Sequence, residues 1–223
     1  MAPTYNSRFP GSRSDGHRGS ALIFDGEMPD ASDNQNHKAE LRNVALTLRD
    51  ALPPTVRQAA AEAIAKRPLP VQVAPGMIVS AYSPMKTEIN PLPLLRKFAE
   101  AGASLALPCI AGRGHPLIMR AWDFGAPLET GQWSIREPMA DAAEVAPDIV
   151  IVPLAAFDRA GHRIGYGAGY YDMTLHKLRA LKKIVAIGIA FAAQEIARVP
   201  ATERDERLDL VLTEREVIHF RPK

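Results

Sequence analysis

DIVIVPLAAFDRAGHRIGYGAGYYD, the stretch Asp148–Asp172, joins an apolar run to a glycine-rich loop. Residues 149–152 of this stretch read Ile-Val-Ile-Val, a β-branched run that is typical of a strand covered on both faces of its sheet. The run ends at Pro153, which cannot donate a hydrogen bond to a neighbouring strand, so the chain must continue as a loop. A strand buried on both faces predicts a layered α/β fold.

The loop that follows has the composition of an anion-binding turn. Glycine occupies every second position, at Gly165, Gly167 and Gly169. Without Cβ atoms, successive backbone N–H groups can point into one concavity and approach a ligand closely. Leucines then recur beside several lysines and arginines, which predicts a helix that starts near Asp172 and directs its N-terminal amides at the loop. The pattern favours a phosphate site, although a tight turn alone would also explain three alternating glycines.

Two familiar glycine motifs do not fit this segment. A dinucleotide fingerprint would need glycine at the position of Tyr170, and a Walker loop would need Gly-Lys-Ser/Thr, which the stretch lacks. Any phosphate recognition must therefore use a different arrangement.

Outward from this segment, predicted strands alternate in large part with predicted helices. Helices are expected over 38–52, 55–66, 92–101 and 173–183, and strands over 77–82, 104–107, 117–122, 149–152, 184–191 and 209–212. This order predicts a single-domain α/β fold over residues 37–223, with a largely parallel layered sheet flanked by helices and a helical N-terminus. Residues 1–36 are polar and lack periodicity, so we expect a disordered tail.

Composition limits the possible partners. The 27 basic and 25 acidic residues leave a net charge of only +2, which speaks against nucleic acid and favours local recognition of a small anion. The single Cys109 excludes an intrachain disulfide and indicates a reducing, cytoplasmic location. The sequence has no apolar run of the roughly 18 residues that would predict a membrane span. We expect a monomer that acts on small molecules.

The stretch from Pro153 to Asp172 resembles the signature of the 5-formyltetrahydrofolate cyclo-ligase family, also called 5,10-methenyltetrahydrofolate synthetases. The likeness covers about residues 37–220 and includes four further segments: the Lys38–Arg42 motif, the Tyr82–Glu88 folate segment, the Ile135–Pro138 Glu-Pro turn and the Val199–Asp209 region. The resemblance implies a reaction in which ATP and Mg²⁺ convert 5-formyltetrahydrofolate into 5,10-methenyltetrahydrofolate, with release of ADP and phosphate.

The resemblance also assigns residues to ATP. It places nine of them at the nucleotide: Lys38, Arg42, Arg163, Gly165, Gly167, Ala168, Gly169, Tyr170 and Tyr171. Of these, it makes Arg163, Tyr170 and Lys38 catalytic. From the residues alone, Lys38 and Arg42 lie on one helical face and could equally be a solvated pair. Arg163 offers a planar donor fork suited to a phosphoryl group, or could simply pair with Asp158 across the turn.

The metal and folate assignments rest on the same resemblance. It makes Asp172 and Asp205 the Mg²⁺ ligands, where the residues alone would also allow a helix N-cap and a solvated charge run. It implies folate contacts from Ser83, Glu88, Tyr166, Tyr170 and Trp122. An exposed loop position for the glutamate and core packing for the aromatic residues are the alternatives.

Two other functions stay open at this stage. A paralogue of the same fold could bind nucleotide and act on a different amide or formyl substrate. A non-catalytic RNA-interaction module is the second, although the near-neutral charge and the lack of an aromatic RNA motif speak against it.

Overall fold

The computed structural model describes residues 31–220 of the chain, with side chains from residue 34 onward. Helix α1 spans Ala31–Asp50, so it begins earlier than the predicted residue 38 and inside the segment that we expected to be a tail. That boundary was wrong. The rest of the tail prediction, over residues 1–30, lies outside the described residues. Within 31–220, no helix is both long and apolar enough to cross a membrane.

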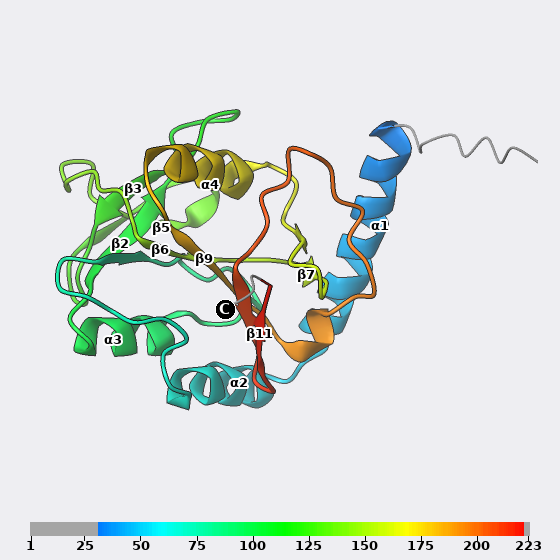
Figure 1. Ribbon diagram of the computed structural model, residues 1–223, viewed down its shortest axis with the longest axis horizontal. Coiled ribbons are helices and arrows are strands. Elements are labelled where there is room, and N and C mark those ends of the chain that lie inside the picture. Colours follow the sequence, from blue (N-terminus) through cyan, green and yellow to red (C-terminus); the bar gives the residue numbers. More distant parts are fainter. Residues whose placement is uncertain (1–30, 221–223) are drawn as a thin grey trace, which may run out of the picture.

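Seven strands form one mostly parallel sheet, which confirms the predicted fold class (Figure 1). Their order across the sheet is β11-β10-β9-β6-β1-β2-β3. The strands are β1 Ile78–Ser80, β2 Ser104–Cys109, β3 Ile118–Ala121, β6 Ile149–Val152, β9 Val185–Ile189, β10 Leu210–Leu212 and β11 Val217–His219. The five from β10 to β2 pair in parallel, and the edge strands β3 and β11 pair antiparallel to their neighbours.

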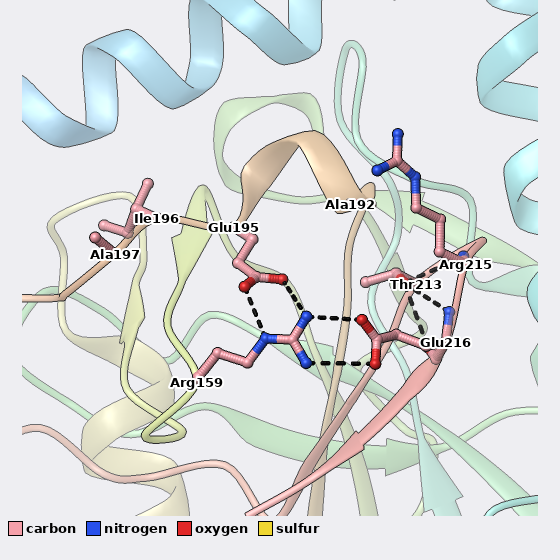
Figure 2. Close-up of a pocket in the computed structure, with 8 residues that line it drawn as sticks. All are labelled: Arg159, Ala192, Glu195, Ile196, Ala197, Thr213, Arg215 and Glu216. Carbon is pink, nitrogen blue, oxygen red and sulfur yellow. Dashed lines mark hydrogen bonds and ion pairs between the residues drawn. The ribbon is translucent and has the colours of Figure 1, made fainter.

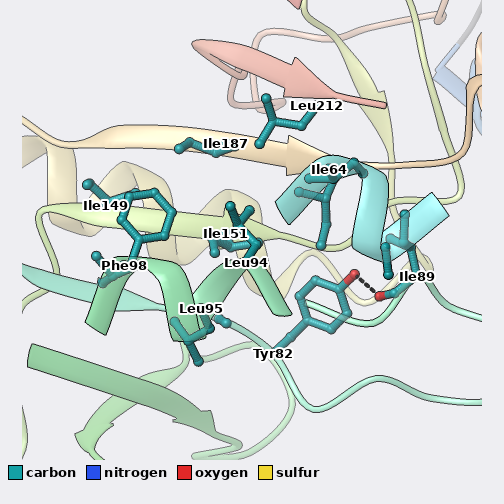
Figure 3. Packing of buried hydrophobic residues seen from close by; sticks show 14 of the residues in the cluster. Ile64, Tyr82, Ile89, Leu94, Leu95, Phe98, Ile149, Ile151, Ile187 and Leu212 are labelled. Carbon is teal, nitrogen blue, oxygen red and sulfur yellow. Dashed lines mark hydrogen bonds between the residues drawn. The ribbon is translucent and has the colours of Figure 1, made fainter. Parts of the chain in front are cut away.

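Helices cover both faces of this sheet, as the all-buried residues of β6 require. Helices α2 (Pro54–Lys66) and α3 (Leu92–Glu100) lie on one side and α4 (Tyr170–Leu181) lies on the other (Figure 1). Because side chains alternate along a strand, Ile149 and Ile151 pack with α2 and α3, as Figure 3 shows, whereas Val150 and Val152 pack with α4. The two clusters hold the central strand rigidly between the layers.

Several short elements were not predicted. Two small hairpins join β4 (Leu128–Thr130) to β5 (Arg136–Pro138) and β7 (Ala156–Phe157) to β8 (Arg163–Ile164). The 3₁₀ turns are η1 (Gln132–Ser134) and η2 (Ala192–Gln194). Runs of two or three residues carry no readable periodicity. The β7-β8 hairpin matters most for the site, because it follows β6 and carries Arg163 and the glycine loop to the carboxyl ends of the parallel strands.

Candidate active site

One cavity of about 1580 Å³ lies beyond the carboxyl ends of β1, β2 and β6. The chain runs from β1 to β2 in one direction across the sheet and from β6 to β9 in the other, so the strand order reverses between β1 and β6. Ligands of open parallel sheets bind at such reversals, because the loops that leave the two strands diverge there. Helix α1 and the loop before β10 complete the wall.

This cavity brings together almost all of the residues predicted for the site. Its lining includes Lys38, Arg42, Ser83, Glu88, Arg163, Gly165, Tyr166, Gly167, Ala168, Gly169, Tyr170, Tyr171, Asp172 and Asp205. They come from α1, the loop after β1, strand β8, the glycine loop, the first turn of α4 and the loop before β10.

The glycine loop turns sharply into α4. Gly167 (φ 97°) and Gly169 (φ 71°) adopt left-handed conformations, which glycine accepts without steric cost. Arg42 reaches across from α1, and its Nε donates a hydrogen bond of 2.7 Å to the Gly165 carbonyl. Burial lowers the pKa of Arg42 below its ordinary value. A guanidinium and the N-terminus of α4 therefore lie on either side of the loop, where both attract an anion.

Arg163 is almost fully buried and is held from two directions. Its Nη2 donates to Asp172 Oδ1 (2.8 Å) and its Nη1 donates to the Glu206 carbonyl (2.6 Å). The alternative pairing with Asp158 is wrong, because the Asp158 carboxylate accepts backbone N–H groups of the turn and of Val199 instead. A cation fixed in this way at the cavity wall is preorganised to meet charge on a ligand.

Asp172 is not the N-cap of α4. Gly169 occupies that position, and Asp172 lies within the first turn, where its Oδ1 also accepts the Glu206 N–H at 3.1 Å. The helix thus begins earlier than the sequence pattern predicted. Asp172 instead ties α4 to the loop before β10, and the helix N-terminus stabilises its negative charge.

Asp205 pairs directly with Lys38 at the cavity wall. The Lys38 Nζ lies 2.6 Å from Asp205 Oδ2, which also accepts the Thr202 N–H at 2.6 Å. Burial raises the pKa of Asp205, but the hydrogen bonds from Lys38 and Thr202 outweigh it and leave the pKa lowered. The reading of this segment as a solvated charge run is wrong for Asp205. Among the described residues, no three or more His, Cys, Asp or Glu side chains lie together so that they could hold a metal ion by themselves.

Glu88 lines the cavity from the loop after β1. Its Oε2 accepts the Met85 N–H at 2.7 Å. Burial raises the pKa of the Glu88 carboxyl, and a hydrogen bond from Tyr166 partly offsets this. Ser83 in the same loop donates to the Arg136 carbonyl at 2.6 Å. Glu88 is therefore neither an exposed loop residue nor a helix-terminal one, and its carboxylate is an acceptor available to a ligand's N–H groups.

Trp122 was a wrong prediction for the cavity wall. Its ring packs against Phe124 and the core beside α3, with Nε1 donating to the Ala126 carbonyl at 3.4 Å. The wall is lined instead by Trp133, whose ring centroid lies 6.0 Å from that of Tyr170. Trp133 sits in a left-handed conformation (φ 55°) in η1, which no sequence pattern indicated.

Glu137 is a second cavity residue that sequence reasoning did not select. The side chain is buried, its Oε1 accepts the Ile110 N–H at 3.3 Å, and burial raises its pKa. The segment around it was predicted to be a turn, but Arg136–Pro138 forms strand β5. A charged residue in a three-residue strand offers no signal that distinguishes it from a surface glutamate.

A smaller cavity of about 380 Å³ lies apart from this site, and Figure 2 shows the ion pairs beside it. Arg159, in the β7-β8 turn, bridges Glu195 (2.7 Å) and Glu216 (2.7 Å). All three side chains are substantially exposed to solvent, so the ion pairs contribute little to stability. Arg159 precedes the buried Arg163 by four positions in the chain.

Comparison with known proteins decides the family. The family model described as the 5-formyltetrahydrofolate cyclo-ligase family matches residues 34–214. The chain belongs to this family. A 5-formyltetrahydrofolate cyclo-ligase of Mycolicibacterium smegmatis is 30% identical over 188 residues, which cover 79% of this chain and 93% of that protein. A cyclo-ligase of Escherichia coli K12 is 30% identical over 62% of this chain and 79% of its own length.

Solved structures agree with the cyclo-ligase assignment. The 5,10-methenyltetrahydrofolate synthetase of Aquifex aeolicus superposes with a TM-score of 0.68 at 29% identity, covering 83% of this chain and 94% of that one. The synthetase of Mycoplasma pneumoniae, at 21% identity and a TM-score of 0.61, has the same fold. The predicted family is confirmed, and with it the enzyme class, a 5-formyltetrahydrofolate cyclo-ligase of one-carbon metabolism.

Proposed function

We propose that this cyclo-ligase uses ATP with Mg²⁺ to convert 5-formyltetrahydrofolate into 5,10-methenyltetrahydrofolate, releasing ADP and phosphate. The observation that carries the proposal is the meeting of two kinds of group in one cavity: cations around the glycine loop, and the Glu88 carboxylate on the side formed by the loop after β1. A polyphosphate suits the first side and the N–H groups of a pterin suit the second.

The chemistry explains why ATP is needed. A formamide oxygen is a poor leaving group, so ring closure first requires its phosphorylation by the γ-phosphate. N10 of the folate then attacks the formyl carbon, the C–O bond breaks so that the oxygen departs as phosphate, and the N10 proton is lost with the phosphate or to water. Neither step needs a nucleophile from the protein, because positioning and charge neutralisation supply the catalysis.

Each cation of the cavity takes a part in this scheme. Lys38 and Arg42, both on α1, bind the phosphates, and the backbone N–H groups of Gly165–Tyr171 donate hydrogen bonds to them. Arg163 neutralises charge on the transferring phosphoryl group. Tyr170 orients the γ-phosphate and the formyl group toward each other. The burial of Arg163 and its two hydrogen bonds support this role, because a fixed cation loses little freedom when charge develops.

The folate side uses Glu88, Ser83, Tyr166 and Tyr170. A carboxylate with a buried environment accepts pterin N–H groups strongly, because fewer waters compete for it. Tyr166 connects this side to the glycine loop, to which it belongs. A monomeric state and a cytoplasmic location remain predictions for the same enzyme.

Asp172 and Asp205 would hold the Mg²⁺. Both carboxylates line the cavity next to the cations, and Mg²⁺ in nucleotide sites commonly takes one or two carboxylates together with substrate phosphates and waters. The donor set therefore fits the ion. When bound, it would neutralise phosphate charge. In the ligand-free arrangement, Lys38 and Arg163 balance the two carboxylates.

Asp205→Asn should raise the half-saturating Mg²⁺ concentration by about 10-fold, because one hard charged oxygen is lost from the ion's shell. Titrating Mg²⁺ at saturating ATP and folate measures this. The exposed Asp141 is not part of the cavity lining, so Asp141→Asn should leave the titration unchanged. An unaltered Mg²⁺ requirement in Asp205→Asn would remove Asp205 from the metal site.

The reaction itself is tested by mixing the purified protein with 5-formyltetrahydrofolate and Mg-ATP and recording methenyltetrahydrofolate absorbance. Product should form only when ATP, Mg²⁺ and folate are all present. A folded protein that binds ATP and makes no product would instead favour the paralogue with a different amide or formyl substrate.

A further inference from the structure

Arg49 is a buried cation that stands behind the cavity wall. It lies in the last turn of α1, and its side chain is 4% exposed. Arg49 does not line the cavity, so it is not one of the groups that would contact the substrates. Burying a guanidinium is costly unless its donors are used, so its partners show what it holds.

The guanidinium joins two loops that are far apart in the sequence. Its Nη1 donates to the Tyr166 hydroxyl at 2.5 Å, and its Nε donates to Thr87 Oγ1 at 3.0 Å. Tyr166 belongs to the glycine loop, between Gly165 and Gly167, and to this loop we assign the nucleotide. Thr87 directly precedes Glu88, on the folate side. One planar group therefore sets the spacing between the two sides.

The electrostatics of the folate side run through the same contacts. Arg49 also lies 3.5 Å from Asp50 Oδ1, and its Cζ lies 5.8 Å from the centre of the Tyr166 ring. Tyr166 donates to Glu88, so the order of contacts is Arg49, Tyr166, Glu88. A ligand that binds Glu88 therefore shifts the Tyr166 hydroxyl that Arg49 contacts. A ligand that orders the glycine loop orders the same hydroxyl.

We propose that Arg49 is a positioning residue that couples the two substrate sites, so that filling one site orders the other. The inference rests on the proposed function, which places nucleotide at the glycine loop and folate at Glu88. Its physical basis is that a productive ternary complex needs both loops ordered in one geometry, and Arg49 contacts both of them. A first ligand that fixes the shared Arg49 contacts leaves less ordering for the second, which is positive cooperativity.

Binding measurements in a thermodynamic cycle test this coupling. The dissociation constant of a non-hydrolysable Mg-ATP analogue is measured with and without saturating 5-formyltetrahydrofolate. In the wild type, folate should tighten nucleotide binding by about fivefold or more. In Arg49→Met the ratio should fall below about twofold, while each ligand alone still binds. A coupling ratio equal to that of the wild type would overturn the proposal.

Two further variants separate coupling from a loss of structure. Thr87→Val removes one hydroxyl at nearly equal volume, which breaks the Arg49 contact to the folate side together with the hydrogen bond from Thr87 to Asp50, so it should also lower the ratio. Arg57→Met removes a guanidinium at the α1-α2 junction that donates to the Leu52 carbonyl, and it should keep the ratio of the wild type. Equal coupling ratios in Arg49→Met and Arg57→Met would show a general effect of charge and would contradict the proposal.

Amide hydrogen exchange in the ligand-free protein distinguishes failure of this inference from failure of the proposed function. Arg49→Met should speed exchange by about fivefold in both residues 163–170 and residues 82–89, since both loops lose their common partner. Faster exchange in one loop alone, or in neither, would refute the coupling whatever the substrate is. Absence of product from the wild type, with both loops loosened together in the variant, would refute the proposed substrates and leave the link between the loops standing.

Discussion

Replacing Arg163 with lysine should lower turnover about 100- to 1000-fold, the loss typical of removing one preorganised donor from a charge-stabilising site. The lysine keeps the charge, but it cannot satisfy Asp172 and the Glu206 carbonyl together and still face the transferring phosphoryl group. Initial rates of methenyltetrahydrofolate formation at saturating substrates measure the effect. The Michaelis constants should change much less than turnover, because the lost interaction is strongest in the transition state.

Arg159→Lys is the matched control for this experiment. It makes the same chemical change on the same hairpin, at exposed ion pairs (Figure 2) whose residues do not line the main cavity. Its turnover should stay within about twofold of the wild type, since exposed salt bridges contribute little. Thermal melting of both variants monitors folding. Normal turnover in a folded Arg163→Lys protein would reduce Arg163 to a structural link between α4 and the loop before β10.

Glu88→Gln should weaken folate binding roughly 10- to 100-fold, because a hydrogen bond to a charged group contributes about 1.5–3 kcal/mol. Binding of the Mg-ATP analogue should change by less than about threefold, since the glycine loop keeps its own contacts. Isothermal titration with each ligand separates the two effects. Glu129→Gln, on β4 and outside the cavity lining, should bind both ligands normally. Equal losses for both ligands in Glu88→Gln would point to a distorted loop instead.

The same carboxyl predicts the pH dependence of folate binding. Burial raises the pKa of Glu88 above its ordinary value of 4.5, so protonation sets in at a higher pH than for an exposed glutamate. Folate affinity of the wild type should therefore fall as pH falls through this raised pKa, and Glu88→Gln should lack that decrease. Because burial disfavours the ionised carboxylate in the folded protein, the variant should melt no lower than the wild type at pH 7. A lower melting temperature would mean that the carboxylate is needed for stability.

Local patterns in the sequence predicted most of the fold. The β-branched run 149–152 is β6 to the residue, and Ile149 and Val150 point to opposite faces as a strand buried on both sides requires. The predicted helices over 55–66 and 92–101 lie within one residue of α2 and α3, because Pro53, Pro54 and Pro91 mark their starts. The glycine spacing likewise indicated a tight loop, and the structure shows Gly167 and Gly169 there in left-handed conformations that glycine accepts without strain.

Other features needed the tertiary structure, because they depend on residues distant in the chain. Lys38 meets Asp205, and Arg49 meets Tyr166, only when α1 packs beside the glycine loop. The sequence did not show that Trp133 rather than Trp122 is the cavity aromatic, because that depends on where the loops that carry them lie in the folded protein. The sequence by itself determined the layered sheet, the family and the chemical groups available for the reaction. The tertiary structure decided which charges pair and how the nucleotide and folate sides join, because charge pairing depends on distance in space and not on spacing along the chain.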